Sequence, residues 1–145
     1  MRFGLVVALG LALGLPAAAT ARVTGAFKTP SGNIICGYDY APGFSSIGCG
    51  IKSGLKPPIP PPAGGCIAGD YSSKRISLNK TGRARPTVCA GDPGPFLVED
   101  RATVLGYGKT WMGRGVWCIS MPAGLTCGNR SGHGFFMSRT RWRLY

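Results

Sequence analysis

Apolar and polar residues alternate over short stretches of this chain, and no long stretch repeats apolar residues at helical spacing. Such alternation is typical of half-buried β-strands, because successive side chains on a strand point to opposite faces. Glycine and proline, both costly inside helices, separate the stretches. We expect strands at 21–27, 33–40, 46–51, 75–79, 86–90, 102–108, 115–120, 125–129 and 134–145. The pattern predicts an all-β fold: a small barrel or sandwich of short antiparallel strands.

The first 21 residues have the form of a secretory signal peptide. Arg2 precedes an apolar run over residues 3–15, and the small residues Ala19 and Ala21 flank Thr20. The run is shorter than the roughly 20 residues that span a membrane, so we expect cleavage after Ala21 and no transmembrane segment in the mature form. Residues 22–145 should then form one exported domain, periplasmic or extracellular, cross-linked by disulfides.

The expected mature chain is strongly basic. Removing 21 residues from 145 leaves 124, with 16 Lys and Arg against 5 Asp and Glu, a formal net charge of +11. Such a charge attracts anionic partners at long range. The candidates are an anionic glycan, a lipid headgroup or an acidic protein, with nucleic acid also open. The alternative is a solvated basic surface that has no dedicated partner.

Six cysteines lie in the expected mature chain: Cys36, Cys49, Cys66, Cys89, Cys118 and Cys127. An even number in a small exported chain predicts disulfides, although the sequence leaves their connectivity open. Two segments place cysteines on either side of a Pro-Gly or Pro-Ala-Gly turn, as facing residues of a hairpin would lie. This favours Cys36 with Cys49 and Cys118 with Cys127, and leaves Cys66 for Cys89. Each bridge should contribute about 3 kcal/mol.

Arginines at alternate positions are the candidate anion-binding groups. If residues 135–145 form one strand, Arg139, Arg141 and Arg143 share one face, roughly 7 Å apart. Arg83 and Arg85 have the same spacing. Arginine binds phosphate, sulfate or carboxylate through paired hydrogen bonds. The alternative is that these charges protect a sheet edge from pairing with another chain.

The only histidine, His133, could act as a general base in a hydrolase. The residues that could assist it are Ser131 or Ser138 as nucleophile and Asp92, Glu99 or Asp100 as orienting acid. No G-x-S-x-G motif supports this grouping, and a histidine between Gly132 and Gly134 is better explained by a tight turn in which the imidazole hydrogen-bonds to backbone. We therefore expect no enzymatic activity.

The sequence predicts neither a metal nor a cofactor. The cysteine spacings contain no C-x-x-C and fit no zinc-finger pattern, and a single histidine is available as a further ligand. Gly108-Lys109-Thr110 lacks the preceding glycine of a phosphate-binding loop.

The segments FKTPSGNIICGY, CAGDPG, VLGYGKTW, GLTCGNRSGHGFFMSR and RLY together resemble a family of small secreted bacterial proteins classed as a domain of unknown function. The resemblance covers nearly all of the mature chain, and it implies export, paired cysteines and one domain, with no activity to carry over. The residues that match its recurring motifs are Ser31, Gly32, Asn33, Gly132, His133, Gly134, Phe135 and Arg139. Ser31, Asn33 and His133 are candidates for a site or for a role in the fold.

The main functional hypothesis is an exported, non-enzymatic domain that binds an anionic envelope or extracellular partner through its basic surface. The alternatives are an inhibitor-like module that binds another protein, and a hydrolase that uses His133. Salt-sensitive retention on a polyanion favours the first. A stoichiometric complex that survives salt favours the second, and turnover abolished in His133→Ala the third.

Overall fold

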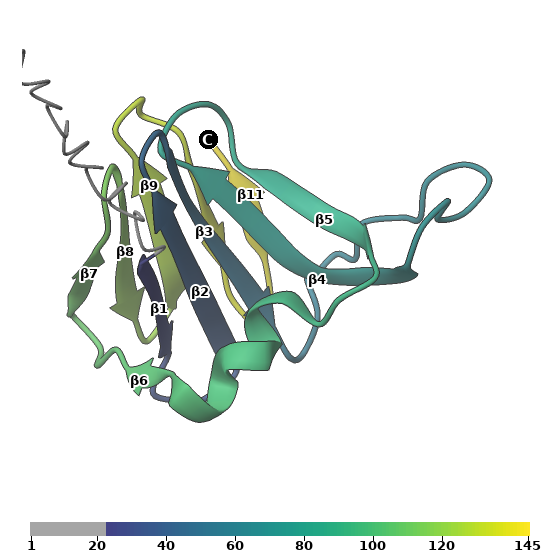
Figure 1. Ribbon diagram of the computed structural model, residues 1–145. Helices are drawn as coiled ribbons and strands as arrows, with labels where there is room; N and C mark the ends of the chain where they lie inside the picture. The colour runs from purple at the N-terminus through teal and green to yellow at the C-terminus, as the bar shows by residue number, and fades with distance from the viewer. Residues whose placement is uncertain (1–22) are drawn as a thin grey trace, which may run out of the picture.

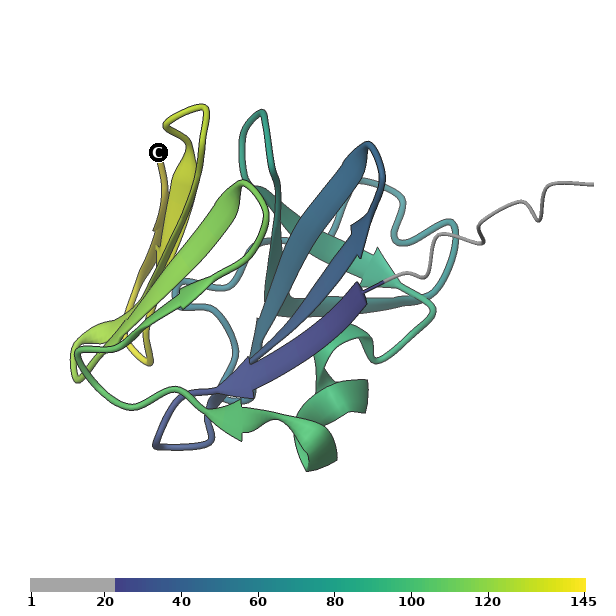
Figure 2. The ribbon, with the colours of Figure 1, turned by 60° about the vertical axis from the view of Figure 1, so that its left-hand side comes forward.

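A computed structural model describes residues 23–145 of the protein (Figure 1). The expected signal peptide, residues 1–21, lies outside this range and stays a prediction. Two sheets pack face to face, as the turned view shows (Figure 2). The predicted all-β fold is confirmed, and it is a sandwich rather than a closed barrel. No helix within residues 23–145 has the length and apolar character needed to cross a membrane.

Sheet A has six strands in the spatial order β5-β4-β3-β2-β1-β6. Its strands are β1 (Val23–Lys28), β2 (Ile34–Ala41), β3 (Phe44–Ile51), β4 (Asp70–Asn79), β5 (Arg85–Ala90) and β6 (Thr103–Val104). Neighbouring strands are antiparallel, except that β6 pairs with β1 in parallel. The 3₁₀ helix η1 (Gly94–Arg101) contacts β1, β2 and β3 on the outer side of this sheet (Figure 2).

Sheet B has five antiparallel strands in the order β11-β10-β9-β8-β7. Its strands are β7 (Thr110–Met112), β8 (Val116–Met121), β9 (Gly124–Asn129), β10 (Gly134–Met137) and β11 (Trp142–Leu144). No segment of residues 23–145 covers the outer face of sheet B (Figure 2). The two sheets therefore differ in how much of their outer surface meets solvent.

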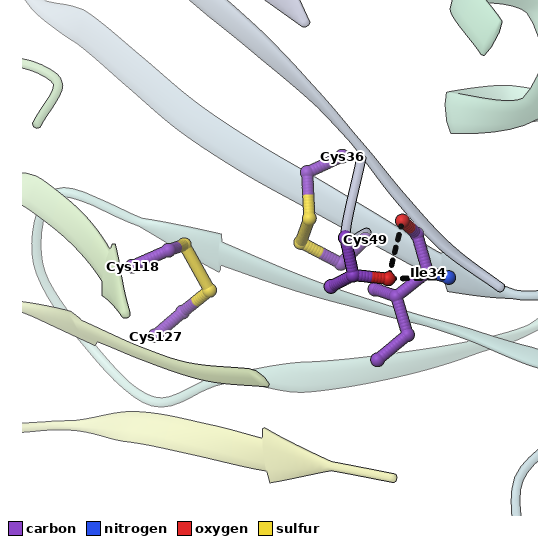
Figure 3. Close-up of a disulfide and its surroundings, with 6 residues drawn as sticks. Ile34, Cys36, Cys49, Cys118 and Cys127 are labelled. Atoms are coloured by element: carbon purple, nitrogen blue, oxygen red, sulfur yellow. Dashed lines mark hydrogen bonds between the residues drawn. A yellow bond between two sulfur atoms is a disulfide. The ribbon is translucent and has the colours of Figure 1, made fainter. Parts of the chain in front are cut away.

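The core lies between the sheets and contains two of the disulfides. Cys36 faces Cys49 across the β2–β3 hairpin, and Cys118 faces Cys127 across the β8–β9 hairpin. All four of these residues are fully buried. The two bridges face each other across the core (Figure 3), with three of their sulfurs within 4.8 Å of one another. Cys66 bonds to Cys89, so the favoured pairing of all six cysteines is confirmed.

Two expectations about secondary structure are wrong. Residues 134–145 form a hairpin, not a single strand, because the chain turns between β10 and β11. The Ser138 hydroxyl drives this turn: it donates to the Arg141 carbonyl and accepts from the amides of Thr140 and Arg141. In addition, the segment 94–101 is helical, and of the expected strand at 102–108 only 103–104 pair in a sheet.

Candidate anion-binding site

The five candidate arginines do not form one site. Arg139 and Arg141 lie in the β10–β11 turn, whereas Arg83 lies in the β4–β5 turn at the opposite end of the sandwich (Figure 1). Arg85 begins the edge strand β5, and Arg143 lies within β11. The expectation of three arginines aligned on one strand face fails because the turn at Ser138 separates Arg139 and Arg141 from Arg143.

A different group of basic residues gathers at the end of the sandwich where the β4–β5, β7–β8 and β9–β10 turns meet. We call this group the basic end, and its members are Lys80, Arg83, Arg114 and Arg130. A side-chain carbon added at Gly115 would lie 3.0 Å from Cβ of Lys80 and 3.5 Å from Cδ of Arg130, so the three turns touch. Each arginine of the basic end is exposed, and no ion pair within residues 23–145 involves any member of the group.

The buried side chain of Asn129 holds the basic end together. Its Oδ1 accepts hydrogen bonds from the Ser131 amide and hydroxyl and from the His133 amide, at 3.0–3.1 Å. Its Nδ2 donates to the carbonyls of Asn79 and Gly82, at 2.9 and 2.8 Å, and thereby joins sheet B to the β4–β5 turn. An Asn that accepts from the amide two residues ahead is a common turn-former. The turn formed by the sequence Asn-Arg-Ser-Gly therefore places Arg130 beside the β4–β5 turn.

Arg114 is fixed by a second set of contacts. Its backbone amide donates to the Tyr38 hydroxyl at 2.9 Å, and its carbonyl accepts from the Ser45 hydroxyl at 2.7 Å. Its guanidinium lies 4.5 Å from the centre of the Tyr40 ring, a distance at which the ring attracts a cation. The position of this positive charge is therefore set by sheet A, although Arg114 belongs to the first turn of sheet B.

His133 lies in the β9–β10 turn, where its amide donates to the Asn129 side chain and its carbonyl accepts from the Asn129 amide. The proposed partners in hydrolysis are dispersed. Ser131 donates its hydroxyl to Asn129, and Ser138 lies at the far end of β10. The acids Glu99 and Asp100 lie in η1 on sheet A. The structure does not bring a histidine, serine and carboxylate together.

Ser31 and Asn33 lie at the end of the sandwich opposite to His133. β9 alone, at about 3.3 Å per residue, separates the two ends by roughly 17 Å. Ser31 and Asn33 line a pocket of about 350 Å³ together with Arg139, which the β10–β11 turn brings to them. Asn33 is already engaged, because it accepts from the Ser53 amide and donates to the Ser53 hydroxyl. The three candidate motif residues therefore occupy two places, not one.

Acidic residues are confined to one side of the molecule. All five lie between positions 39 and 100, on sheet A or in the segment that contains η1: Asp39, Asp70, Asp92, Glu99 and Asp100. Residues 103–145, which include all of sheet B, contain six Lys and Arg and no Asp or Glu. A groove of about 520 Å³ beneath η1 is lined by Asp39, Asp92 and Arg101 and so carries mixed charge. The positive surface faces away from it.

Sequence reasoning missed Lys80, Arg114, Arg130 and Asn129. A signal was present: the last 43 residues lack Asp and Glu, while two of these basic residues follow an asparagine and a third lies between two glycines. Such positions are turn tips. What could not be read from the sequence is that three turns, remote along the chain, meet at one end.

The model of a family of unknown function, DUF6636, matches residues 7–145. The chain belongs to this family. The match spans both sheets and every residue of the basic end, so the resemblance to a domain of unknown function is confirmed, while the secretion and the individual motifs stay predictions. Neither the curated proteins nor the solved structures contain a match. Membership in DUF6636 assigns no activity, and the functional argument therefore depends on the geometry.

Proposed function

We propose that this domain is exported and binds an anionic partner, without catalysis, through the basic end and the adjoining side of sheet B. The observation that carries the proposal is the separation of charge: every acidic side chain lies at positions 39–100, and residues 103–145 have six basic residues and none of opposite sign. Three disulfides agree with an oxidising compartment outside the cytoplasm.

The charge separation matters because salt limits the distance over which each charge acts. At physiological salt the field of an exposed charge decays over about 8 Å. The acids at positions 70, 92, 99 and 100 therefore neutralise little of the potential at the basic end, whereas Asp39, which is in register with Ser46 and Asn79, offsets part of it. A one-signed surface raises the local concentration of anions and speeds their association. The same net charge distributed evenly would give a weaker attraction at any one place.

The basic end suits a ligand with several separate anionic groups. Its four basic side chains come from three turns that Asn129 and Tyr38 hold in position. Three of the four are arginines, whose planar guanidinium groups can each form paired hydrogen bonds with carboxylate, sulfate or phosphate. A polyanion with charges at intervals could engage them together.

The test compares two triple variants that remove the same charge. Arg83→Ser, Arg114→Ser and Arg130→Ser change the basic end. The control changes the exposed residues Lys52, Lys74 and Arg101 to Ser; these lie in or beside sheet A, and Lys52 pairs with Glu99 on the acidic side. Retention of oxidised residues 22–145 on immobilised heparin and alginate would be measured over a salt gradient.

We expect the basic-end variant to elute at much lower salt and the control to elute near the wild type. The slope of log K against log salt should become shallower by roughly one for each ion pair with the ligand that a substitution removes. Equal weakening in the two variants would show that net charge alone governs retention, and that the basic end is not a site. A complex with a protein that persists in high salt would favour the inhibitor-like alternative.

A further inference from the structure

No segment of residues 23–145 passes over the outer face of sheet B (Figure 2). The strand register places Met112, Trp117, Gly128 and Gly134 in one row, which Tyr145 completes by pairing with Gly134. This row borders the β7–β8 and β9–β10 turns, and is therefore continuous with the basic end.

The second row runs parallel to the first and lies two residues further along each strand, away from the basic end. It contains Thr110, Ile119, Thr126, Phe136 and Arg143. Met121 lies on the same face of β8, because it is two residues beyond Ile119.

Glycines allow the aromatic rings of this face to lie against the sheet. A Cβ added at Gly128 would lie 2.3 Å from the Trp117 ring, and one added at Gly134 would lie 2.6 Å from the Tyr145 ring. Phe136 covers Gly124 in the same way. Trp117 is half-buried and Tyr145 is exposed, so the rings that contact these glycines stay partly accessible to a ligand.

Two arginines complete the face. Arg141 lies 5.4 Å from the centre of the Phe136 ring, and Arg143 is opposite Phe136 in the strand register. The two rows contain no Asp, Glu, Asn or Gln, which are the strongest side-chain acceptors for hydrogen bonds from sugar hydroxyls or from an amine. A ligand that binds here must bring its own acceptors to the guanidinium groups.

We propose that the outer face of sheet B binds an anionic polysaccharide, with its sugar rings stacked on Trp117 and Tyr145 and its carboxylates or sulfates on Arg141, Arg143 and the basic end. This inference rests on the proposed function and names its ligand class. The apolar face of a pyranose ring presents C–H bonds that the negative face of an aromatic ring attracts. A chain of sugars can repeat this contact from strand to strand.

The same observations weigh against two other occupants. Membrane-surface proteins use Trp and Tyr side chains that reach into the headgroup layer, whereas these rings rest against backbone. Single-stranded nucleic acid also stacks on aromatic rings, but three disulfides indicate an oxidising compartment, where polysaccharides are the common polyanions.

The experiment measures binding of oxidised residues 22–145 to alginate, to vesicles of phosphatidylglycerol and phosphatidylcholine, and to oligo-dT. The variants are Trp117→Leu, which keeps an apolar side chain but removes the ring, and Trp117→Phe, which keeps a ring. Leu97→Ala is the matched control, since Leu97 is an exposed apolar residue of η1, on the acidic side. Circular dichroism verifies that each variant is folded.

We expect alginate to bind, Trp117→Leu to weaken it roughly tenfold at every salt concentration, Trp117→Phe to weaken it less, and Leu97→Ala to have no effect. If alginate binds the wild type and Trp117→Leu equally, the polysaccharide face is refuted while the polyanion function stands. The polysaccharide face is also refuted if the protein binds vesicles and Trp117→Leu binds them equally well, or if the protein binds oligo-dT in preference to alginate. If none of the three probes binds and immobilised heparin does not retain the protein either, the proposed function itself fails.

Discussion

Replacing Asn129 by Asp separates local hydrogen bonding from overall electrostatics. The two side chains have the same shape, but Asp places an oxygen where the Nδ2 of Asn129 donates to the carbonyls of Asn79 and Gly82, at 2.9 and 2.8 Å. The basic end, by contrast, should attract a negative charge. The two effects have opposite signs, so the stability of the variant decides which one dominates.

The local effect should be the larger. Two partly buried hydrogen bonds are removed, each worth about 1 kcal/mol net, and the two carbonyl oxygens are left facing another acceptor, at a further cost of about 1 kcal/mol. The gain from exposed arginines and lysine near the new charge is at most about 1 kcal/mol, because water and salt screen it. We expect Asn129→Asp to lower the free energy of unfolding by roughly 2 kcal/mol.

The assay is urea denaturation at pH 7 with the disulfides intact, followed by both tryptophan fluorescence and far-ultraviolet circular dichroism to verify a two-state transition. Asn33→Asp is the control, since Asn33 is also a turn asparagine but its Nδ2 donates to the Ser53 hydroxyl. That hydroxyl can rotate and donate to a carboxylate instead. Its substitution should therefore change stability by less than about 0.5 kcal/mol.

An Asn129→Asp protein that is as stable as the wild type, or more stable, would refute this reasoning. It would mean that the attraction of the basic end exceeds the contribution of the two donated hydrogen bonds. In that case Asn129 could no longer be regarded as the residue that fixes the geometry of the three turns.

Three further outcomes are expected. Mild reduction and alkylation of the folded protein should label Cys66 and Cys89 first, because both are half-buried whereas the other four cysteines are fully buried; mass spectrometry of peptides decides this. Gly134→Ala should destabilise the fold by more than about 1 kcal/mol, because the added Cβ would lie 2.2 Å from a backbone oxygen. Gly48→Ala is the control and should not destabilise it, because a Cβ at Gly48 has free space. Equal melting temperatures of the two variants would contradict this prediction. Burial raises the pKa of Tyr145, and the nearby Arg143 lowers it by less. The contribution of neutral Tyr145 to stability is therefore complete below pH 10 and is lost as pH rises through the raised pKa. Ultraviolet titration of the wild type and of Tyr145→Phe measures this pKa.

The alternation of apolar residues and the turn residues predicted most of the sheet structure. The β2–β3 and β8–β9 hairpins follow from local sequence, because facing residues in a hairpin are only a few positions apart. The turn at Ser138 was missed, since it lacks glycine and proline and depends on a side-chain hydroxyl. η1 was missed because a short 3₁₀ segment has no clear apolar period.

The candidate site was predicted less well than the fold. The five arginines that the sequence singled out are all exposed, but three of them were grouped by their spacing on a single strand that does not exist. Lys80, Arg114 and Arg130 are 34 and 16 positions apart and meet only because two sheets align the ends of their hairpins. Contacts between turns of different hairpins leave no periodic pattern in a single sequence.

The pairing of the cysteines bears on how the protein is made. The first cysteine bonds to the second, the third to the fourth and the fifth to the sixth, and no bridge connects sheet A to sheet B. A chain that enters an oxidising space N-terminus first would present its thiols in this order. Each hairpin can bring its own two thiols together before they are oxidised, because hairpins form within microseconds whereas disulfide formation takes seconds or longer. Local folding of this kind favours the native partner at each oxidation, so few wrong bonds should need rearrangement.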